Sequence, residues 1–389
     1  MHLRSRLSIS HIYNLNLTYF KRTFHTSFCG LKGLDILFFG SDEFSRECFR
    51  SVDDLAASSS SVVHKLEVVT RPPKRNGRDR STSSQTVEVP LAPFARERNR
   101  TVHFVETKQD FENIQTLSYD LLVVVSYGKL IPAQLITRTK YGGINLHPSL
   151  LPRHSGAAPL QAAILDNDEF SGVTIQTLHP TQFDRGSILM QSLPVRLSLD
   201  ETSKSLGQRL SKVGADMLRE FLKTLSEYID KHPNDEGPEI VIDSFKTNSE
   251  EIRLLPRTWT KKIDSRARHI NWATDSASTI ERKWRAFGLP LWTEIRYFDR
   301  HNQTAHLSRR AILEDITIVD NMGSIPSLEV GSIPNLPGQY LRLGPGKQFF
   351  AQTVVRTCDG KLLLVQMKQE KVRGKSLVDS DIFDLSSHK

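Results

Sequence analysis

The sequence predicts an α/β fold: a doubly wound, Rossmann-like N-terminal domain followed by a smaller C-terminal domain built as an OB-like β-barrel. A chain of 389 residues is long for one domain and suits two. Residues 34–55 give a strand, a glycine turn and a helix in succession, which is how a doubly wound unit begins. Residues 120–126 are a continuous apolar run, typical of a central parallel strand buried on both faces. After residue 290, short strand-like segments alternate with Gly and Pro turns, as in a small barrel.

The elements of the first domain follow one another as such a sheet requires. The first strand ends at Phe39 and runs through Gly40 into a helix that ends near Leu55. A long amphipathic helix over residues 201–228 carries its apolar side chains on one face. The expected strands cover residues 34–39, 65–70, 120–126, 143–147, 173–178 and 187–191.

Two polar stretches interrupt this pattern. Residues 71–84 are rich in Arg, Pro and Gly and hold almost nothing to bury, so we expect a long exposed loop. On composition alone it is either a binding loop or a solvated insertion. Residues 230–257 have the composition of a linker. We therefore expect the first domain over residues 33–229 and the second over residues 258–389.

The second domain carries most of the excess positive charge. The whole chain has a formal net charge of +8, and residues 251–389 hold 22 Lys and Arg against 15 Asp and Glu. Such a balance favours contact with nucleic acid, with a solvated basic face as the alternative. The expected elements here are a helix over residues 276–287 and strands over residues 291–297, 339–343, 349–357 and 361–367.

The first 32 residues differ in composition from the rest. They contain five basic residues, and no acidic residue occurs before Asp35. Apolar and aromatic residues are interspersed with Ser and Thr, without the compact apolar stretch of a secretory signal. We interpret residues 1–32 as a mitochondrial transit peptide and expect the protein in the mitochondrial matrix. A disordered basic tail is the alternative.

Composition also argues against a membrane protein, a disulfide-rich protein and a metalloprotein. No apolar run approaches the roughly 18–20 residues needed to span a bilayer, so we expect no membrane association. The three cysteines are Cys29, Cys48 and Cys358, too scattered for a disulfide framework or a Cys-based zinc site. His, Cys and carboxylates nowhere cluster at ligand spacing, so we expect no metal.

Three polar residues are the candidate catalytic set. Asn145 and His147 are two apart on an expected strand, so their side chains share a face. They stand at the carboxyl end of that strand, where open α/β sheets place their active sites. Asp184 follows the next expected strand and can reach the same cleft. Taken singly, each residue fits a structural role, and only the joint pattern indicates catalysis.

Residues 144–161 resemble the signature of the 10-formyltetrahydrofolate-dependent formyltransferases. Residues 174–186 continue the likeness, which extends over nearly the whole chain after the N-terminal segment. Residues 126–132, 262–272 and 285–290 resemble most closely the members that act on methionyl-tRNA. The chain departs from the family in having His154-Ser155 where an aromatic-Arg pair is usual. It also has Gly40-Ser-Asp where Gly-Thr-Pro is usual.

The resemblance implies attack of an amine on the formyl carbon of 10-formyltetrahydrofolate, the donor cosubstrate, with no metal. Asn145 is then an oxyanion and orientation donor, and His147 the main oxyanion stabiliser and proton donor. Asp184 holds the orientation and protonation of His147. The pterin ring is expected in an apolar pocket bonded mainly by backbone groups. The residues expected around it are Tyr127, Gly128, Ser149, Leu150, Leu151 and Pro152.

The resemblance also implies an acceptor, initiator Met-tRNA, and no obligate protein partner, so we expect a monomer. Arginines of the loop over residues 71–84 are suited to enter the acceptor stem, and Arg78 aligns with the discriminating arginine of the family. The residues expected to contact tRNA are Arg71, Lys74, Arg75, Arg78, Arg80, Lys371, Arg373 and Lys375.

Two alternatives remain open at this point. The first is a formyltransferase or formyl-folate hydrolase that acts on a small-molecule amine or on water. The second is a non-catalytic RNA-binding protein that keeps the fold. The basic loop and the basic second domain favour tRNA over a small amine, and the intact set of Asn145, His147 and Asp184 favours an enzyme.

Overall fold

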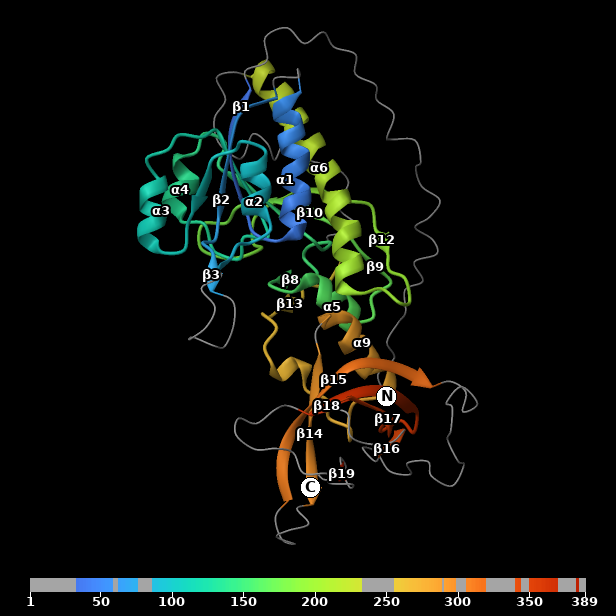
Figure 1. The fold of residues 1–389 in the computed structure, drawn as a ribbon. Coiled ribbons are helices and arrows are strands. Elements are labelled where there is room, and N and C mark those ends of the chain that lie inside the picture. The colour runs from blue at the N-terminus through green and yellow to red at the C-terminus, as the bar shows by residue number, and fades with distance from the viewer. Residues whose placement is uncertain are drawn as a thin grey trace, which may run out of the picture.

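The structure is a computed structural model that places an α/β domain beside a smaller domain rich in β-strands (Figure 1). The described ranges are residues 33–58, 62–75, 86–232, 255–288, 290–298, 306–319, 340–343, 350–369 and 383–384. The interpretation of residues 1–32 as a transit peptide lies outside them. Within these ranges no helix is long and apolar enough to cross a bilayer.

A seven-stranded sheet forms the centre of the first domain, in the order β11-β10-β7-β6-β1-β2-β5. The five strands from β7 to β5 run parallel, while β10 is antiparallel to both β7 and β11. The bounds are β1 Leu34–Gly40, β2 Val63–Thr70, β5 Val102–Phe104, β6 Leu121–Val125, β7 Gly143–His147, β10 Thr174–Thr177 and β11 Ile188–Gln191. The predicted Rossmann-like sheet is confirmed, with an antiparallel edge that the sequence did not indicate.

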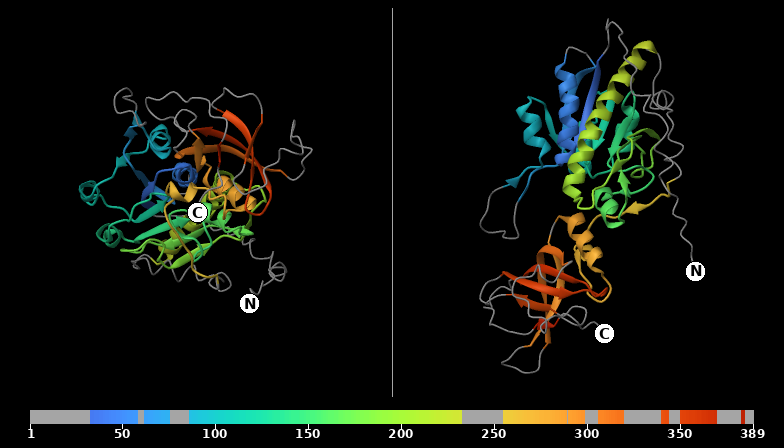
Figure 2. Two further views of the ribbon diagram at one scale, coloured as in Figure 1. Left: turned by 90° about the horizontal axis from the view of Figure 1, so that it is seen from below. Right: turned by 90° about the vertical axis from the view of Figure 1, so that its right-hand side faces the viewer.

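Helices cover both faces of this sheet because its central strands are apolar on both sides. Ile36 and Phe38 of β1 point into the core beneath α1 (Glu43–Ala57) and α6 (Ser203–Lys231). Leu37 and Phe39 point to the opposite core, which α3 (Lys108–Ile114) and α4 (Ala133–Arg138) cover. Each of these four side chains is fully buried, and each such burial contributes about 1.5–3 kcal/mol. Figure 2 shows α1 and α6 side by side along the length of the domain.

Shorter elements complete the first domain. Helix α2 (Leu91–Glu97) packs against α1 and β2, and α5 (Pro159–Leu165) begins at the proline that the sequence placed in its first turn. Strands β9 (Phe170–Ser171) and β12 (Val195–Arg196) pair antiparallel. Residues 71–84 were predicted to form one exposed loop, but they contain a short strand near their beginning. Strand β3 (Lys74–Arg75) pairs with β4 (Thr86–Val87), and residues 76–85 between them lie outside the described ranges.

The second domain has an antiparallel sheet in the order β16-β17-β18-β15-β14-β19. Its helix α9 (Ala277–Phe287) begins at Ser276, whose side chain accepts from the Thr279 amide, and ends at Gly288 with φ +54°. A short 3₁₀ helix η2 (Arg266–Arg268) precedes α9. The strands are β14 Leu291–Phe298, β15 His306–Val319, β16 Tyr340–Leu343, β17 Phe350–Arg356, β18 Leu362–Gln369 and β19 Phe383–Asp384.

The two domains meet through hydrogen bonds as well as apolar packing. Strand β13 (Trp259–Thr260), from the segment that enters the second domain, pairs parallel with β8 (Ser155–Gly156) of the first. Helix α9 packs on α5, and the Arg285 guanidinium donates to the Glu201 carbonyl at 2.7 Å. Arg285 is buried, so this bond lies inside the contact between the domains.

Candidate active site

The alternation of side chains along β7 separates its apolar and polar residues. Ile144 and Leu146 point into the core beneath α1 and α6, so Asn145 and His147 point to the other face. His147 is only 5% exposed. Both stand at the carboxyl end of a parallel strand, where this class of sheet opens its cleft.

Asp184 lies beside both of them, in the loop between β10 and β11. Its Oδ1 accepts from Asn145 Nδ2 at 3.2 Å and from Gln176 Nε2 at 2.9 Å, and lies 3.4 Å from His147 Nδ1. Its Oδ2 accepts from the Gly156 amide at 2.7 Å. The side chain is 6% exposed, and the backbone adopts φ +52°, which few residues other than glycine take readily. The carboxylate is therefore held rigidly by donors from three separate segments.

The His147 ring is fixed from both sides. Nδ1 faces the Asp184 carboxylate, and Nε2 lies 2.9 Å from the main-chain carbonyl of His154. Both neighbours are acceptors, so a protonated imidazole donates to both, whereas a neutral one donates to only one. Both nitrogens of the ring therefore already face acceptors within the protein, which fixes the orientation of the imidazole beside Asp184.

Gln176 and Arg257 at this site were missed by sequence reasoning, whereas Gly156 lies within the signature of residues 144–161. Gln176 pairs in register with Asn145 across β10 and β7, a relation that the sequence does not encode. Gly156 has φ +108°, and a Cβ there would lie 2.3 Å from the Thr260 carbonyl oxygen. Arg257 donates to Ser155 Oγ at 3.2 Å and to the Asp184 carbonyl at 3.3 Å. Burial and then the charge of Arg185 lower the pKa of Arg257.

The residues predicted around the pterin ring fall into two places. Tyr127 is fully buried, donates to the Val105 carbonyl at 3.0 Å and packs edge-on against Phe39, so its ring belongs to the core under α3 and α4. Burial raises its pKa. The next residue, Gly128, is exposed with φ +77°, and open space surrounds it.

The other predicted pocket residues form one loop after β7. The Ser149 hydroxyl donates to the Arg153 carbonyl at 2.7 Å, and the Leu151 amide donates to Thr174 Oγ1 at 3.1 Å. The Leu151 carbonyl accepts from Gln191 Nε2 at 2.8 Å. Leu150 and Leu151 are buried, and Pro152 is partly buried. This loop is therefore fixed to β10 and β11 beside the catalytic candidates.

Of the residues predicted to contact tRNA, only two have described side chains. Arg71 Nε donates to Ser41 Oγ at 3.3 Å, at the carboxyl ends of β2 and β1. Lys74 Nζ lies 3.6 Å from Glu106 Oε1. The side chain of Arg75 and the whole of Arg78, Arg80, Lys371, Arg373 and Lys375 lie outside the described residues.

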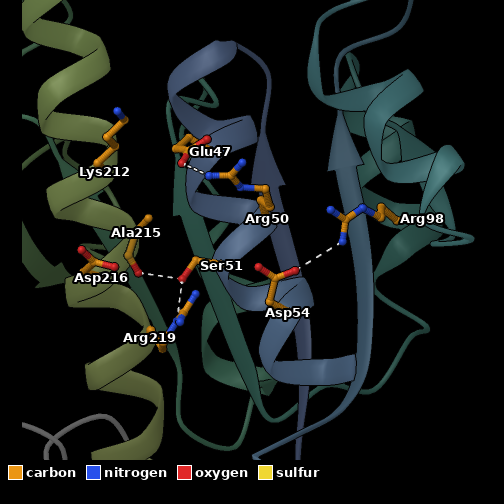
Figure 3. Close-up of a pocket in the computed structure, with 9 residues that line it drawn as sticks. All are labelled: Glu47, Arg50, Ser51, Asp54, Arg98, Lys212, Ala215, Asp216 and Arg219. Carbon is orange, nitrogen blue, oxygen red and sulfur yellow. Dashed lines mark hydrogen bonds and ion pairs between the residues drawn. The ribbon is translucent and has the colours of Figure 1, made fainter. Parts of the chain in front are cut away.

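A hollow of about 500 Å³ between α1 and α6 is a separate feature (Figure 3). It shares no lining residue with the cluster of Asn145, His147 and Asp184. Ser51 donates to the Ala215 carbonyl at 2.9 Å and accepts from Arg219 Nε at 3.2 Å, which ties the two helices together. We assign this hollow to helix packing and not to the candidate site.

Comparisons with known proteins place the first domain in a family and show which solved structures share its fold. Residues 34–222, which contain the sheet and the polar cluster, match the family model described as Formyl transferase. A variant of HypX from Aquifex aeolicus shares the fold with a TM-score of 0.51 and 15% identity, covering 87% of this chain and 45% of that one. Residues 34–222 therefore form a formyltransferase domain.

Curated relatives narrow the class. The mitochondrial methionyl-tRNA formyltransferase of Saccharomyces cerevisiae is 31% identical over 284 residues, which cover 66% of this chain and 68% of the yeast protein. The human mitochondrial enzyme is 32% identical over 66% of this chain and 58% of its own length. A methionyl-tRNA formyltransferase of Lachnospira eligens is 28% identical over 90% of this chain and 95% of its own. The chain belongs to the methionyl-tRNA formyltransferase family, so the resemblance inferred from residues 144–161 is confirmed.

Proposed function

We propose that this enzyme transfers the formyl group of 10-formyltetrahydrofolate to the α-amino group of methionine on initiator Met-tRNA, giving formylmethionyl-tRNA for mitochondrial translation. The observation that carries the proposal is the hydrogen-bonded cluster of Asn145, His147 and Asp184, in a chain of this family, at the carboxyl edge of a parallel sheet. Membership of the family favours tRNA over the small-molecule alternative.

The chemistry requires one new bond and one broken bond. The methionine nitrogen attacks the formyl carbon, a tetrahedral intermediate forms, and the bond from that carbon to N10 of the folate breaks. The attacking nitrogen loses a proton and N10 gains one. An α-amino group with an ordinary pKa of about 7.7–8.0 is partly neutral near pH 8, so no strong base is needed.

Each residue of the cluster has a part in this reaction. Asn145 and His147 stabilise the oxyanion of the intermediate, and His147 delivers the proton to the leaving nitrogen. Asp184 keeps His147 in place from 3.4 Å, and its contacts with Gln176 and Gly156 keep it rigid in turn. These contacts preorganise the Asp184 carboxylate, which reduces the reorganisation that the reaction requires.

The donor is proposed to bind beside the loop that follows β7. The loop of residues 149–152 and the open space beside Gly128 supply its surroundings, and the buried Tyr127 anchors the backbone next to Gly128. The tRNA is proposed to contact Arg71, Lys74, Arg75, Arg78 and Arg80, with Arg78 discriminating the initiator. We assign Lys371, Arg373 and Lys375 of the second domain to phosphate contacts. The antiparallel sheet there supports the proposed OB-like barrel.

The proposed setting is the mitochondrial matrix, with residues 1–32 as the transit peptide, residues 33–229 as the catalytic domain and residues 258–389 as the tRNA-binding domain. We propose a monomer without an obligate protein partner. Fusion of residues 1–35 to a reporter tests the localisation, because a reporter that stays in the cytosol contradicts it.

One assay tests the reaction: formyl transfer to Met-tRNA with and without 10-formyltetrahydrofolate, run against a panel of small amines. We expect transfer to Met-tRNA alone. Transfer to a small amine identifies the first alternative, and no transfer with retained tRNA binding identifies the second. Near wild-type turnover in Asn145→Ala, His147→Ala and Asp184→Ala alike contradicts the assigned chemistry.

A further inference from the structure

The candidate catalytic histidine is oriented by a second histidine. His147 Nε2 lies 2.9 Å from the carbonyl oxygen of His154, so the position of that carbonyl determines how the His147 ring turns. His154 has φ +56°, the left-handed conformation, which costs free energy for a residue with a side chain. Neighbouring groups must therefore hold the backbone at His154 in place.

The side chain of His154 supplies that hold. It is 3% exposed, and its Nε2 lies 2.6 Å from Asp168 Oδ2. Asp168 is itself anchored by Arg153, whose Nε donates at 2.9 Å and whose Nη2 contacts the other oxygen. Burial raises the pKa of Asp168, but the hydrogen bonds from His154 and Arg153 outweigh it and lower the pKa overall. The carboxylate is therefore charged and able to fix the ring.

The opposite side of His154 is held from the segment that enters the second domain. Thr258 Oγ1 accepts from the His154 amide at 2.7 Å and lies 3.3 Å from His154 Nδ1. The Thr258 carbonyl also accepts from the Ser155 amide at 3.0 Å. When His154 Nε2 carries the proton and donates it to Asp168, His154 Nδ1 can accept from the Thr258 hydroxyl. Every polar group of this network then has a partner.

We propose that His154 is a positioning residue for His147: Asp168 and Thr258 clamp its side chain, and the clamp fixes the carbonyl that orients the catalytic imidazole. The inference rests on the proposed function, because it assigns His147 a catalytic role. It also gives a purpose to His154, a position at which this chain departs from the pattern usual in its family. In this chain the catalytic histidine is thus tied to the segment that joins the two domains.

The test is a double-mutant cycle on the full-length protein, with kcat and KM measured for Met-tRNA and for 10-formyltetrahydrofolate. We expect His154→Ala to lower kcat about 10- to 100-fold, because a catalytic group is misplaced, while both KM values change little. In the His147→Ala background the same substitution lowers kcat no further than about twofold. His154→Gln, which restores a donor near the position of Nε2, recovers most of the loss.

A second variant separates the clamp from general damage to the contact between domains. Thr258→Val keeps the shape and removes the hydroxyl, so it lowers kcat and again has no effect once His147 is alanine. The matched control is Thr260→Val, because Thr260 bonds Ala158 and Ser155 in the same contact and does not touch His154. Equal losses in both threonine variants contradict the inference.

The outcomes keep the inference and the proposed function apart. If His147→Ala lowers kcat while His154→Ala does not, the positioning role is wrong and the proposed function stands. If the losses from His154→Ala and His147→Ala multiply, His154 acts independently of His147 and the inference is again wrong. If His147→Ala keeps wild-type turnover, His147 is not catalytic. The chemistry proposed for the site is then wrong, and the positioning role of His154 is wrong with it.

Discussion

Replacing Asp184 with asparagine removes the charge beside His147 and keeps the size of the side chain. At 3.4 Å, and with an effective dielectric constant of about 20, the attraction between the carboxylate and a protonated His147 is about 5 kcal/mol at most. Part of that is retained, because an amide oxygen can still face His147. We therefore expect kcat/KM to fall about 10²–10³-fold, the usual cost of disturbing one preorganised donor.

The same substitution has a smaller effect on folding. The amide oxygen of the new side chain can accept from Asn145 and Gln176 as Oδ1 does now, but its NH₂ group then faces the Gly156 amide. The partly buried Gly156 N–H loses its acceptor, which costs about 1–3 kcal/mol.

The assay is formyl transfer to Met-tRNA, with denaturant unfolding measured on the same preparations. Asp200→Asn is the matched control, since Asp200 is an exposed carboxylate of the same domain. A kcat/KM for Asp184→Asn within about threefold of wild type shows that His147 needs no charged neighbour and refutes this reasoning.

Three further predictions concern stability. Asp42 caps helix α1, because its Oδ1 accepts from the Ser45 amide at 2.9 Å, so Asp42→Ala should cost about 0.5–2 kcal/mol in denaturant unfolding, and a wild-type midpoint contradicts this. Gly156→Ala should cost at least about 2 kcal/mol in denaturant unfolding, because its Cβ meets the Thr260 carbonyl at 2.3 Å, and a wild-type midpoint would show that this contact relaxes freely. Arg285→Met should cost about 2–3 kcal/mol, since it leaves the Glu201 carbonyl and the Glu281 carboxylate without their donor; a change below about 0.5 kcal/mol would mean that the domains do not depend on this bond.

The long or strongly apolar elements were predictable from sequence alone. Strands β1, β6 and β7 and helices α1, α6 and α9 lie within about three residues of their expected ends, because a sustained apolar pattern marks each of them. Helices α2, α3 and α4 were missed, since six or seven residues are too few to display a helical period. Strand β15 was also missed: Glu314 and Asp315 interrupt its apolar run, at the point where its register with β18 shifts.

The candidate site was predictable only where its residues lie on one strand. Asn145 and His147 share one strand, and the period of two places them together from sequence. The contacts of Asp184 with Gln176 and Gly156, and of Thr258 with His154, join segments that are distant in the chain. Such contacts depend on strand register and domain contact, which local sequence patterns do not encode.

The pairing of β13 with β8 has a consequence for engineering this enzyme. A chimera that takes everything after Lys231 from a relative would import residues 255–260, and with them a foreign partner for the loop of residues 154–156. A splice placed just beyond Thr260 would leave that loop with its native neighbour. By these hydrogen bonds, the smallest unit that keeps this loop intact extends to Thr260, past the end of α6 at Lys231.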